Sequence, residues 1–315
     1  MANSEQLHVV FGASGALGNA VVRELVAQSM RVRGVTRSGN ADVPNGVEMI
    51  AADALLPERV RAACDGASVI YNCANAPYTN WPKEFPPIMQ GIIDGASAAG
   101  AKLVFGDNLY SYGPVDGPLT EDLQNAATGR KGRTRTLMAD MLMEAHASGK
   151  LKAAIGRGSD FYGPRVMTSA IGDRVIPAAL AGKGSQVLGN PDTLHTYTYV
   201  PDFARALVVL GERDEALGEI WHVPNAKTIT TREMLDIVYE LAGHEAKVMA
   251  APKLLLNAIS LFNPMVRELK ETYYQFDKPF VVDHSKFKRA FGAQVTPHRE
   301  ALTDTIDWYR SRSGA

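Results

Sequence analysis

The feature that most constrains this chain is a glycine-rich turn between a short apolar run and a segment with helical periodicity. Leu7 to Phe11 form the apolar run, and Gly12-Ala13-Ser14-Gly15-Ala16-Leu17-Gly18 follows it directly. The run predicts a buried strand, and the periodicity from Asn19 to Gln28 predicts a helix. A strand, a glycine turn and a helix in this order indicate a dinucleotide-binding site.

The chemistry expected of this turn is phosphate binding by the backbone. Glycines let the chain turn tightly and approach a pyrophosphate, while free N–H groups and the positive end of the helix dipole hold the anion. The alternative is a glycine-rich loop without a ligand. The residues expected to contact a cofactor here are Gly12, Ser14, Gly15, Ala16, Leu17 and Gly18.

The end of the second predicted strand bears on which dinucleotide binds. Valines alternate from Arg31 to Thr36, and the chain continues with Arg37 and Ser38. An NAD enzyme usually has Asp or Glu here to accept from the ribose 2′-hydroxyl, whereas Arg suits the 2′-phosphate of NADP. We therefore expect NADP(H) in preference to NAD(H), the alternative being that Arg37 is a solvated surface residue.

Further apolar runs between helical segments define the predicted fold. These runs are Val69 to Cys73, Leu103 to Phe105, Ala153 to Ile155 and Ile220 to Val223. The alternation predicts an α/β fold, a doubly wound parallel sheet of the Rossmann type with helices on both faces.

The same reading divides the chain into two parts. We expect residues 1–160 to form the dinucleotide-binding domain, to which residues 200–223 return with a helix from Pro201 to Gly211. Residues 161–199 and 224–315 should form a smaller, C-terminal substrate lobe. Its predicted helices are Thr231 to Leu241, Pro252 to Glu271 and Thr296 to Tyr309.

Composition excludes several classes of partner. Lys and Arg number 33 against 34 Asp and Glu, so no attraction to nucleic acid or to an anionic membrane is expected, and a small molecule is the expected partner. The two cysteines, Cys64 and Cys73, lack the spacing of a metal site and are typical of reduced thiols in a cytoplasmic protein. The N-terminus has no secretory pattern, and the longest apolar stretch, Lys253 to Phe262, is too short to cross a bilayer.

Several segments, taken together, resemble the extended short-chain dehydrogenase/reductase family, which includes nucleotide-sugar epimerases, dehydratases and many NADPH reductases. They are the glycine turn, Ala51-Ala52-Asp53-Ala54-Leu55, Asn72-Cys73-Ala74-Asn75, Ser111-Tyr112-Gly113-Pro114, Arg157 to Pro164 and Tyr197 to Asp202. The resemblance implies that Asp53 and Ala54 contact the adenine and that Ala74 and Asn75 lie against the cofactor ribose. It also places Gly158 and Ser159 among the cofactor-binding residues, and it implies a homodimer through helices that flank the sheet.

The chain departs from the family at the catalytic residues. Members normally use a Ser or Thr and a Tyr-x-x-x-Lys pair, but here Lys131 stands at the tyrosine position, Arg135 at the lysine position and Asn108 at the hydroxyl position. The resemblance implies that Arg135 keeps a positive charge near the nicotinamide ribose and that the Asn108 amide holds a substrate carbonyl.

Three side chains remain as candidate proton donors. Lys131, expected also to contact the cofactor, can donate if burial or the charges of neighbouring arginines favour its neutral amine, the alternative being a surface lysine. Tyr112 and Tyr110 carry phenols near the carboxyl edge of the sheet, although core packing explains such residues equally well.

The lobe carries aromatic and soft apolar residues and few groups suited to a nucleotide diphosphate, which favours a moderately apolar carbonyl or enone as substrate. These residues, which can also be core, are Phe161, Tyr162, Met167, His195, Tyr197, Phe262, Tyr273, Tyr274 and Phe276. His195 can serve in acid–base chemistry or be a structural histidine.

The leading hypothesis is an NADPH-dependent reductase. One alternative is a regulatory protein that senses NADP(H) without catalysis, and another is a nucleotide-sugar epimerase or dehydratase, whose chemistry relies on a deprotonated tyrosine.

Overall fold

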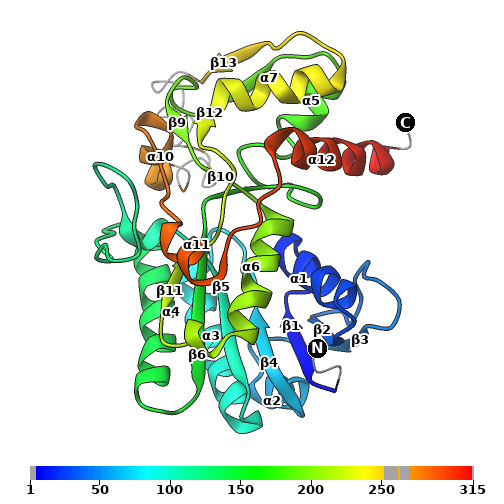
Figure 1. Ribbon diagram of the computed structural model, residues 1–315, viewed down its shortest axis with the longest axis vertical. Helices are drawn as coiled ribbons and strands as arrows, with labels where there is room; N and C mark the ends of the chain where they lie inside the picture. Colours follow the sequence, from blue (N-terminus) through cyan, green and yellow to red (C-terminus); the bar gives the residue numbers. More distant parts are fainter. Residues whose placement is uncertain (1–4, 252–261, 263–267, 269, 314–315) are drawn as a thin grey trace.

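The computed structural model describes residues 5–251, 262, 268 and 270–313, and it contains one central parallel sheet. The sheet has seven strands in the order β11-β6-β5-β4-β1-β2-β3 (Figure 1). Its strands are β1 (Leu7–Phe11), β2 (Arg31–Thr36), β3 (Glu48–Ala51), β4 (Ala67–Asn72), β5 (Lys102–Asn108), β6 (Lys152–Gly158) and β11 (Ile220–His222). This order confirms the predicted doubly wound fold.

Helices cover both faces of the sheet, which explains why its inner strands are largely buried. All five residues of β1 are buried, for example. One face packs against α1 (Ala16–Ala27), α6 (Val200–Glu212) and α11 (Ser285–Phe291). The other face packs against α2 (Pro57–Cys64), α3 (Trp81–Ala99) and α4 (Arg130–Ala147). The strand order reverses between β1 and β4, the position where such sheets bind ligands at their carboxyl edge.

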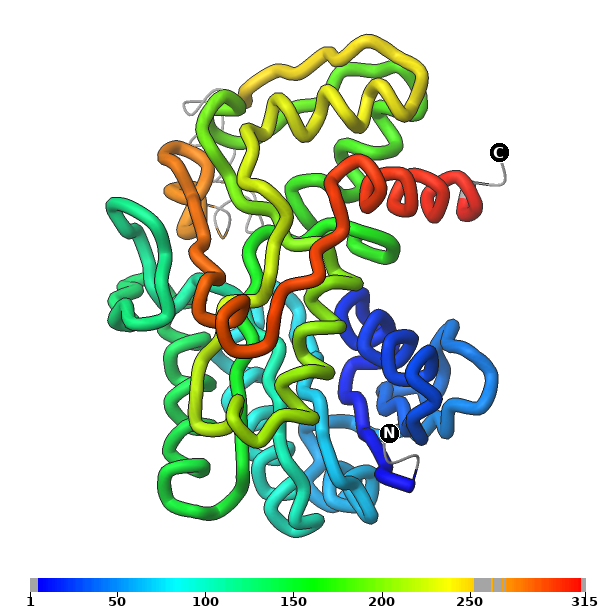
Figure 2. Tube along the Cα trace, in the orientation of Figure 1, coloured from blue at the N-terminus to red at the C-terminus, as the bar shows by residue number. Residues whose placement is uncertain are grey.

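The lobe lies over the carboxyl edge of the sheet and has a core of its own (Figure 2). Its helices are α5 (Ile176–Leu180), α7 (Thr231–Ala242), α10 (Tyr274–Asp277) and α12 (His298–Ser313). Its strands pair two by two and are β7 (Asp160–Tyr162) with β10 (Tyr197–Tyr199), β9 (Leu194–His195) with β12 (Ile229–Thr230), and β8 (Ser185–Val187) with β13 (Val248–Ala250). Short 3₁₀ turns occur at η1 (Tyr110–Tyr112) and η2 (Asp214–Ala216).

Two parts of the predicted organisation differ from the structure. The edge strand β3 was not predicted; it has only four residues, of which two are exposed and two are half-buried. Helix α11 falls within the stretch expected to be lobe, yet its Phe287 packs against Trp221 of β11 in the sheet core. The predicted helix from Pro252 to Glu271 lies mostly outside the described residues.

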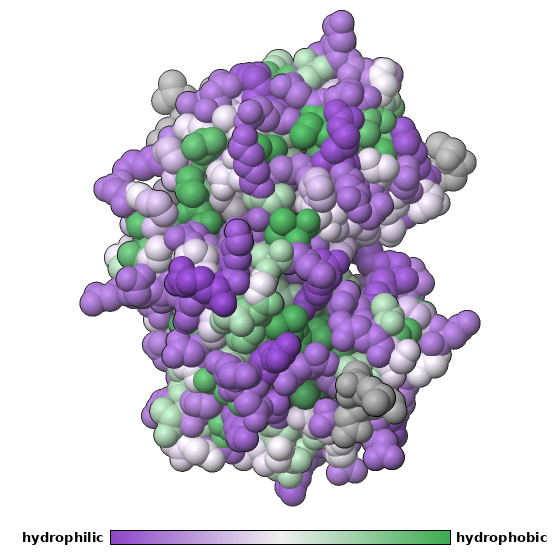
Figure 3. Space-filling model, viewed as in Figure 1, coloured by the Kyte–Doolittle hydropathy of each residue, from purple (hydrophilic) through white to green (hydrophobic). Residues whose placement is uncertain are grey.

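The surface of the molecule is mostly polar. Polar residues cover most of the face in Figure 3, and apolar residues form small separate groups. In the part of the chain that the structure describes, none of the helices combines the length and the apolarity needed to span a lipid bilayer.

A network of buried charges joins β5, β6 and α4. Asp107 and Arg157 are register partners on β5 and β6, and the Arg157 Nε lies 3.1 Å from the Asp107 Oδ2. Arg135 of α4 pairs with the other oxygen of Asp107 at 3.4 Å. Arg157 and Asp107 are fully buried, so one carboxylate neutralises part of the charge of two guanidinium groups inside the core.

Replacement of Asp107 by Asn should therefore destabilise the fold strongly. Both guanidinium groups would stay buried without a counter-charge, which costs about 3–5 kcal/mol. Asp94→Asn is the matched control, because the ion pair of Asp94 with Lys150 is exposed and should contribute less than about 1 kcal/mol. Urea denaturation measures both free energies of unfolding, and equal losses in the two variants would contradict this account of Asp107.

A second prediction concerns His222, which joins β11 to its neighbours. Its Nδ1 donates to the Asp283 carbonyl at 2.9 Å, and its Nε2 accepts from the Tyr112 phenol at 2.8 Å. Burial lowers the pKa of His222 from 6.5 to about 4. Between these two values the unfolded chain binds a proton that the folded chain does not, so the free energy of unfolding should fall as the pH drops from 6.5 to 4.

For His222 alone this loss should reach about 3 kcal/mol, since a tenfold change in proton affinity is worth about 1.4 kcal/mol. His222→Gln keeps both hydrogen bonds without titrating, so its stability should depend less on pH over this range. Denaturation curves at several pH values test this, and parallel profiles for the variant and the parent would refute it.

Candidate functional site

The glycine turn brings α1 into close contact with β1 and β4. Gly12 has a φ of +80°, and a Cβ there would lie 2.4 Å from the Cys73 carbonyl oxygen. A Cβ on Gly18 would lie 2.2 Å from the Gly12 oxygen. Both positions therefore require glycine, and the Gly12 N–H donates to Val35 of β2 at 3.0 Å, which fixes the turn between the strands.

The start of α1 is suited to an anion. Gly15 is the N-cap residue of α1, which has neither a side-chain cap nor an acidic residue in its first turn. Ser14 and Gly15 are exposed, and Ala16 and Leu17 are half-buried. Backbone N–H groups at such a helix start bind phosphate, so these residues fit the diphosphate of a dinucleotide.

Arg37 and Asp53 lie on neighbouring strand ends. The register pairs Thr36 of β2 with Ala51 of β3, so the residues that follow both strands meet at the same edge. Arg37 is exposed and forms no ion pair with any carboxylate in the described ranges. The Asp53 carboxylate accepts from the Leu55 N–H at 3.0 Å and shapes the turn, in which Ala54 is half-buried.

The loop after β4 borders the same crevice. The Asn72 side chain accepts from the Ala74 N–H at 3.2 Å and holds the start of this loop. Ala74 is half-buried and Asn75 is exposed. Both residues thus lie next to the glycine turn, whose Gly12 touches the neighbouring Cys73.

Lys131 is buried, so it is not the surface lysine that the sequence left open. Its side chain is 1% exposed, and its ammonium pairs with Glu268 and donates to the Tyr78 carbonyl oxygen at 3.2 Å. The same nitrogen lies 3.9 Å from the centre of the Tyr78 ring. The Glu268 carboxylate and the Tyr78 ring thus surround this buried nitrogen.

Glu271 binds the first turn of α4, which begins next to Lys131. Its Oε1 accepts from the Lys131 N–H at 2.6 Å and the Gly132 N–H at 3.3 Å. A Cβ on Gly129 would lie 2.3 Å from this oxygen. The carboxylate therefore supplies the cap that the glycine N-cap lacks. No local signal predicts this contact, because Glu271 follows about 140 residues later.

Arg135 directs its charge into the core. Its guanidinium lies 4.5 Å from the ring centres of Trp81 and Phe85 and pairs with Asp107. Asp107 is the shared carboxylate of the buried network. The charge of Arg135, which was expected near the nicotinamide ribose, thus lies against the ring of Trp81.

Asn108 and Tyr112 take up different positions at the end of β5. The Asn108 Oδ1 accepts from the Tyr110 N–H at 3.0 Å, and Asn108 remains half-buried at the carboxyl edge. Tyr112 is buried, and its phenol is occupied by His222, which favours a structural role for this tyrosine. The Tyr110 phenol in turn forms a hydrogen bond with that of Tyr78.

Gly158 and Ser159 connect β6 to the lobe. The Ser159 hydroxyl donates to the Thr196 carbonyl at 2.6 Å, and its N–H donates to the Thr198 hydroxyl at 2.8 Å. A Cβ on Gly158 would lie 2.8 Å from the Phe203 ring. Packing and hydrogen bonding within the protein thus account for both residues, which were expected to bind the cofactor.

An aromatic cluster lies beside Lys131. The Trp81 ring is 5.1 Å from Tyr78 and 6.0 Å from Tyr110. Burial raises the pKa of Tyr78 and Tyr110, and the charge of Asp160 adds to both shifts. The same two causes raise the pKa of Tyr274 on α10. Tyr78 and Trp81 were not predicted as site residues, although aromatic residues after the fourth strand were a usable signal.

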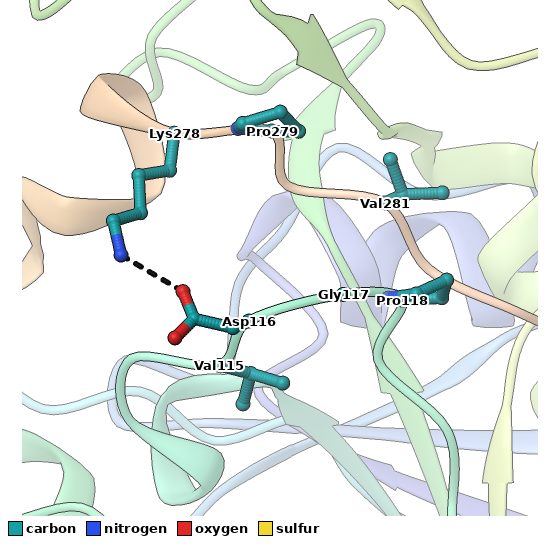
Figure 4. A pocket seen from close by; sticks show the side chains of 7 residues that line it. All are labelled: Val115, Asp116, Gly117, Pro118, Lys278, Pro279 and Val281. Carbon is teal, nitrogen blue, oxygen red and sulfur yellow. Dashed lines mark hydrogen bonds and ion pairs between the residues drawn. The ribbon is translucent and has the colours of Figure 1, made fainter.

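The other aromatic lobe residues do not form one surface. Tyr162 and Tyr197 lie in the lobe core, whereas Met167 and Phe262 are exposed. A separate shallow hollow of about 280 Å³ lies between Val115, Asp116 and the segment Lys278–Val281, where Lys278 pairs with Asp116 (Figure 4). Its lining includes no residue of the glycine turn.

Comparisons with known proteins agree with this geometry. The model of the NAD dependent epimerase/dehydratase family matches residues 8–223. The 2-alkyl-3-oxoalkanoate reductase of Shewanella oneidensis is 22% identical over 270 residues, 79% of this chain and 70% of that relative. Cinnamoyl-CoA reductase 1 of Oryza sativa subsp. japonica is 25% identical over 331 residues, 96% of this chain and 90% of that relative.

The fold is shared with solved structures as well. The UDP-glucuronic acid 4-epimerase of Bacillus cereus, in complex with UDP-glucuronic acid and NAD, superimposes with a TM-score of 0.78 at 18% identity, covering 98% of this chain and 100% of that one. With the family model matching most of its length, this chain belongs to the NAD dependent epimerase/dehydratase family of extended short-chain dehydrogenases/reductases.

Proposed function

We propose that this protein is an NADP(H)-dependent reductase that acts on a carbonyl or enone of a moderately apolar small molecule. The family uses a nicotinamide cofactor, and the observation that carries the NADP(H) preference is Arg37. Its exposed guanidinium follows β2, where no carboxylate is present to accept from a ribose 2′-hydroxyl. The 2′-phosphate of NADP(H) would give this guanidinium a negatively charged partner.

The described residues fit each part of such a cofactor. N–H groups of Gly12 to Gly18 would hold the diphosphate, Asp53 and Ala54 would border the adenine, and Ala74 and Asn75 would border the ribose. When bound, the reduced cofactor would supply the hydride for reduction. The protein contributes binding, orientation and a proton.

The surroundings of Lys131 favour an apolar carbonyl substrate. Tyr78, Trp81 and Tyr110 offer aromatic surface, and the carboxylate of Asp160 lies beside them. A carboxylate there opposes the negative charge of a nucleotide diphosphate. The relatives from Shewanella and rice bear the names of reductases, which supports reduction as the class of reaction.

A second candidate function is sensing of NADP(H) without catalysis. The supporting observation is that Lys131 and Arg135, at the positions of the family pair, are both buried in ion pairs. An epimerase or dehydratase cycle has less support, because it needs a deprotonated tyrosine where Lys131 stands.

Arg37→Ala should weaken NADPH binding by about 1.5–3 kcal/mol, the value of a charge-assisted contact, and leave NADH binding unchanged. This corresponds to roughly a 10- to 150-fold rise in Kd for NADPH. Arg31→Ala is the matched control, since Arg31 is exposed at the opposite end of the same strand. Calorimetry measures the affinity of the parent and of each variant for NADPH and for NADH. An equal loss of affinity for both coenzymes in Arg37→Ala would count against the preference for NADP(H).

The reductase proposal predicts turnover of NADPH with at least one class among aldehydes, ketones, quinones and enones. The readout is the absorbance of the reduced nicotinamide, with a control that lacks substrate. Activity with NADPH should exceed activity with NADH by about tenfold or more if Arg37 binds the 2′-phosphate. Saturable NADPH binding without turnover on any class would reject the reductase in favour of the sensor.

A further inference from the structure

His195 lies between two hydrogen-bond acceptors. Its Nδ1 is 3.1 Å from the backbone carbonyl oxygen of Gln275, and its Nε2 is 2.7 Å from the Asp160 Oδ2. A carbonyl oxygen can only accept, so Nδ1 carries a proton. The ring orientation is therefore set by the main chain of α10.

This arrangement requires one further proton between the two side chains. A neutral ring with its proton on Nδ1 would present the lone pair of Nε2 to an ionised carboxylate at 2.7 Å, which is repulsive. A proton on this contact, on the nitrogen or on the oxygen, turns it into a short charge-assisted hydrogen bond. Asp160 and His195 thus share a proton.

The histidine is fixed and shielded from water, whereas the aspartate remains accessible. The His195 ring stacks on Phe276 with centres 5.3 Å apart and on Phe280 at 5.4 Å. The side chain of His195 is 2% exposed and that of Asp160 is 16% exposed. The carboxyl group is therefore the end of the pair that a ligand can reach.

Asp160 lies on the wall of the candidate site. Asn108 of β5 is the register partner of Gly158, and Asp160 follows two residues later at the same carboxyl edge. Its charge acts on the phenols of Tyr78, Tyr110 and Tyr274. Lys131 lies against Tyr78 of the same cluster, with Glu268 and the Tyr78 carbonyl as partners of its ammonium.

We propose that Asp160 and His195 together are the proton donor of this active site, with Asp160 as the catalytic residue and His195 as the residue that positions and recharges it. This inference rests on the reductase function proposed above. It supplies the acid that the chain lacks at the tyrosine position of the family.

The step balances as a two-electron reduction. A bound reduced nicotinamide would supply a hydride to the carbonyl carbon of the substrate, and the π pair of the C=O bond would move onto oxygen. That oxygen takes the shared proton and becomes a hydroxyl group. The pair remains as a carboxylate and a neutral imidazole, still bonded to Gln275, and regains its proton from water.

The first test needs no substrate and no cofactor. Long-range ¹H–¹⁵N correlations from the carbon-bound ring protons report whether each ring nitrogen of His195 carries a proton or a lone pair. The Nε2 resonance should be displaced towards the protonated position at pH 7, and Asp160→Asn should return it to the lone-pair position. An Nε2 resonance that is the same in both proteins would overturn the shared proton.

The second test is kinetic. Asp160→Asn should lower kcat by about 10²- to 10⁴-fold, the usual contribution of a general acid, while KM and the Kd for NADPH change only slightly. His195→Asn should lower kcat in the same direction. Asp304→Asn is the matched control, because Asp304 accepts from the Tyr199 hydroxyl in the lobe and its amide can still do so.

The outcomes separate this inference from the proposed function. If the parent protein reduces a carbonyl compound and Asp160→Asn retains its kcat, the donor pair is refuted and the reductase stands. If the parent reduces nothing, the reductase fails, and the ring spectrum still decides whether the proton is shared. Thermal unfolding of each variant verifies that it is folded.

Discussion

Burial of positive charge at the start of α4 is the constraint on which the rest of the site depends. Lys131 and Arg135 stand where the family resemblance predicts the catalytic pair, and both side chains are almost without contact to water. A buried cation is tolerated only with a counter-charge or an aromatic face. The structure supplies both, with Glu268 and Tyr78 for Lys131 and with Asp107 and Trp81 for Arg135.

In this protein the two tasks of the family pair, cofactor binding and proton transfer, would fall to different residues. Lys131 at the start of α4 pairs with Glu268 of the lobe, and Arg135 pairs with Asp107 in the core. Their N–H groups are therefore bound by carboxylates of the protein. Under the proposed function, proton transfer would come from Asp160 and His195.

Local patterns predicted much of the scaffold. The glycine turn, the alternating strands and Arg37 are features of contiguous residues, and each was placed correctly along the chain. The partners of Lys131 could not be predicted this way, since Glu268 is 137 residues away and no periodicity links them. For the same reason Tyr112 remained a candidate donor until its contact with His222, 110 residues later, was known.

One stretch of the lobe connects these elements. Glu268 and Glu271 neutralise the start of α4, while Gln275, Phe276 and Phe280 orient His195 from the following residues. The same short stretch therefore balances the buried charge of the sheet domain and prepares the proposed acid. A substitution there that frees Lys131 would also act on the segment that orients His195, so under the proposed function the burial of Lys131 and the acid supplied by the lobe would depend on each other.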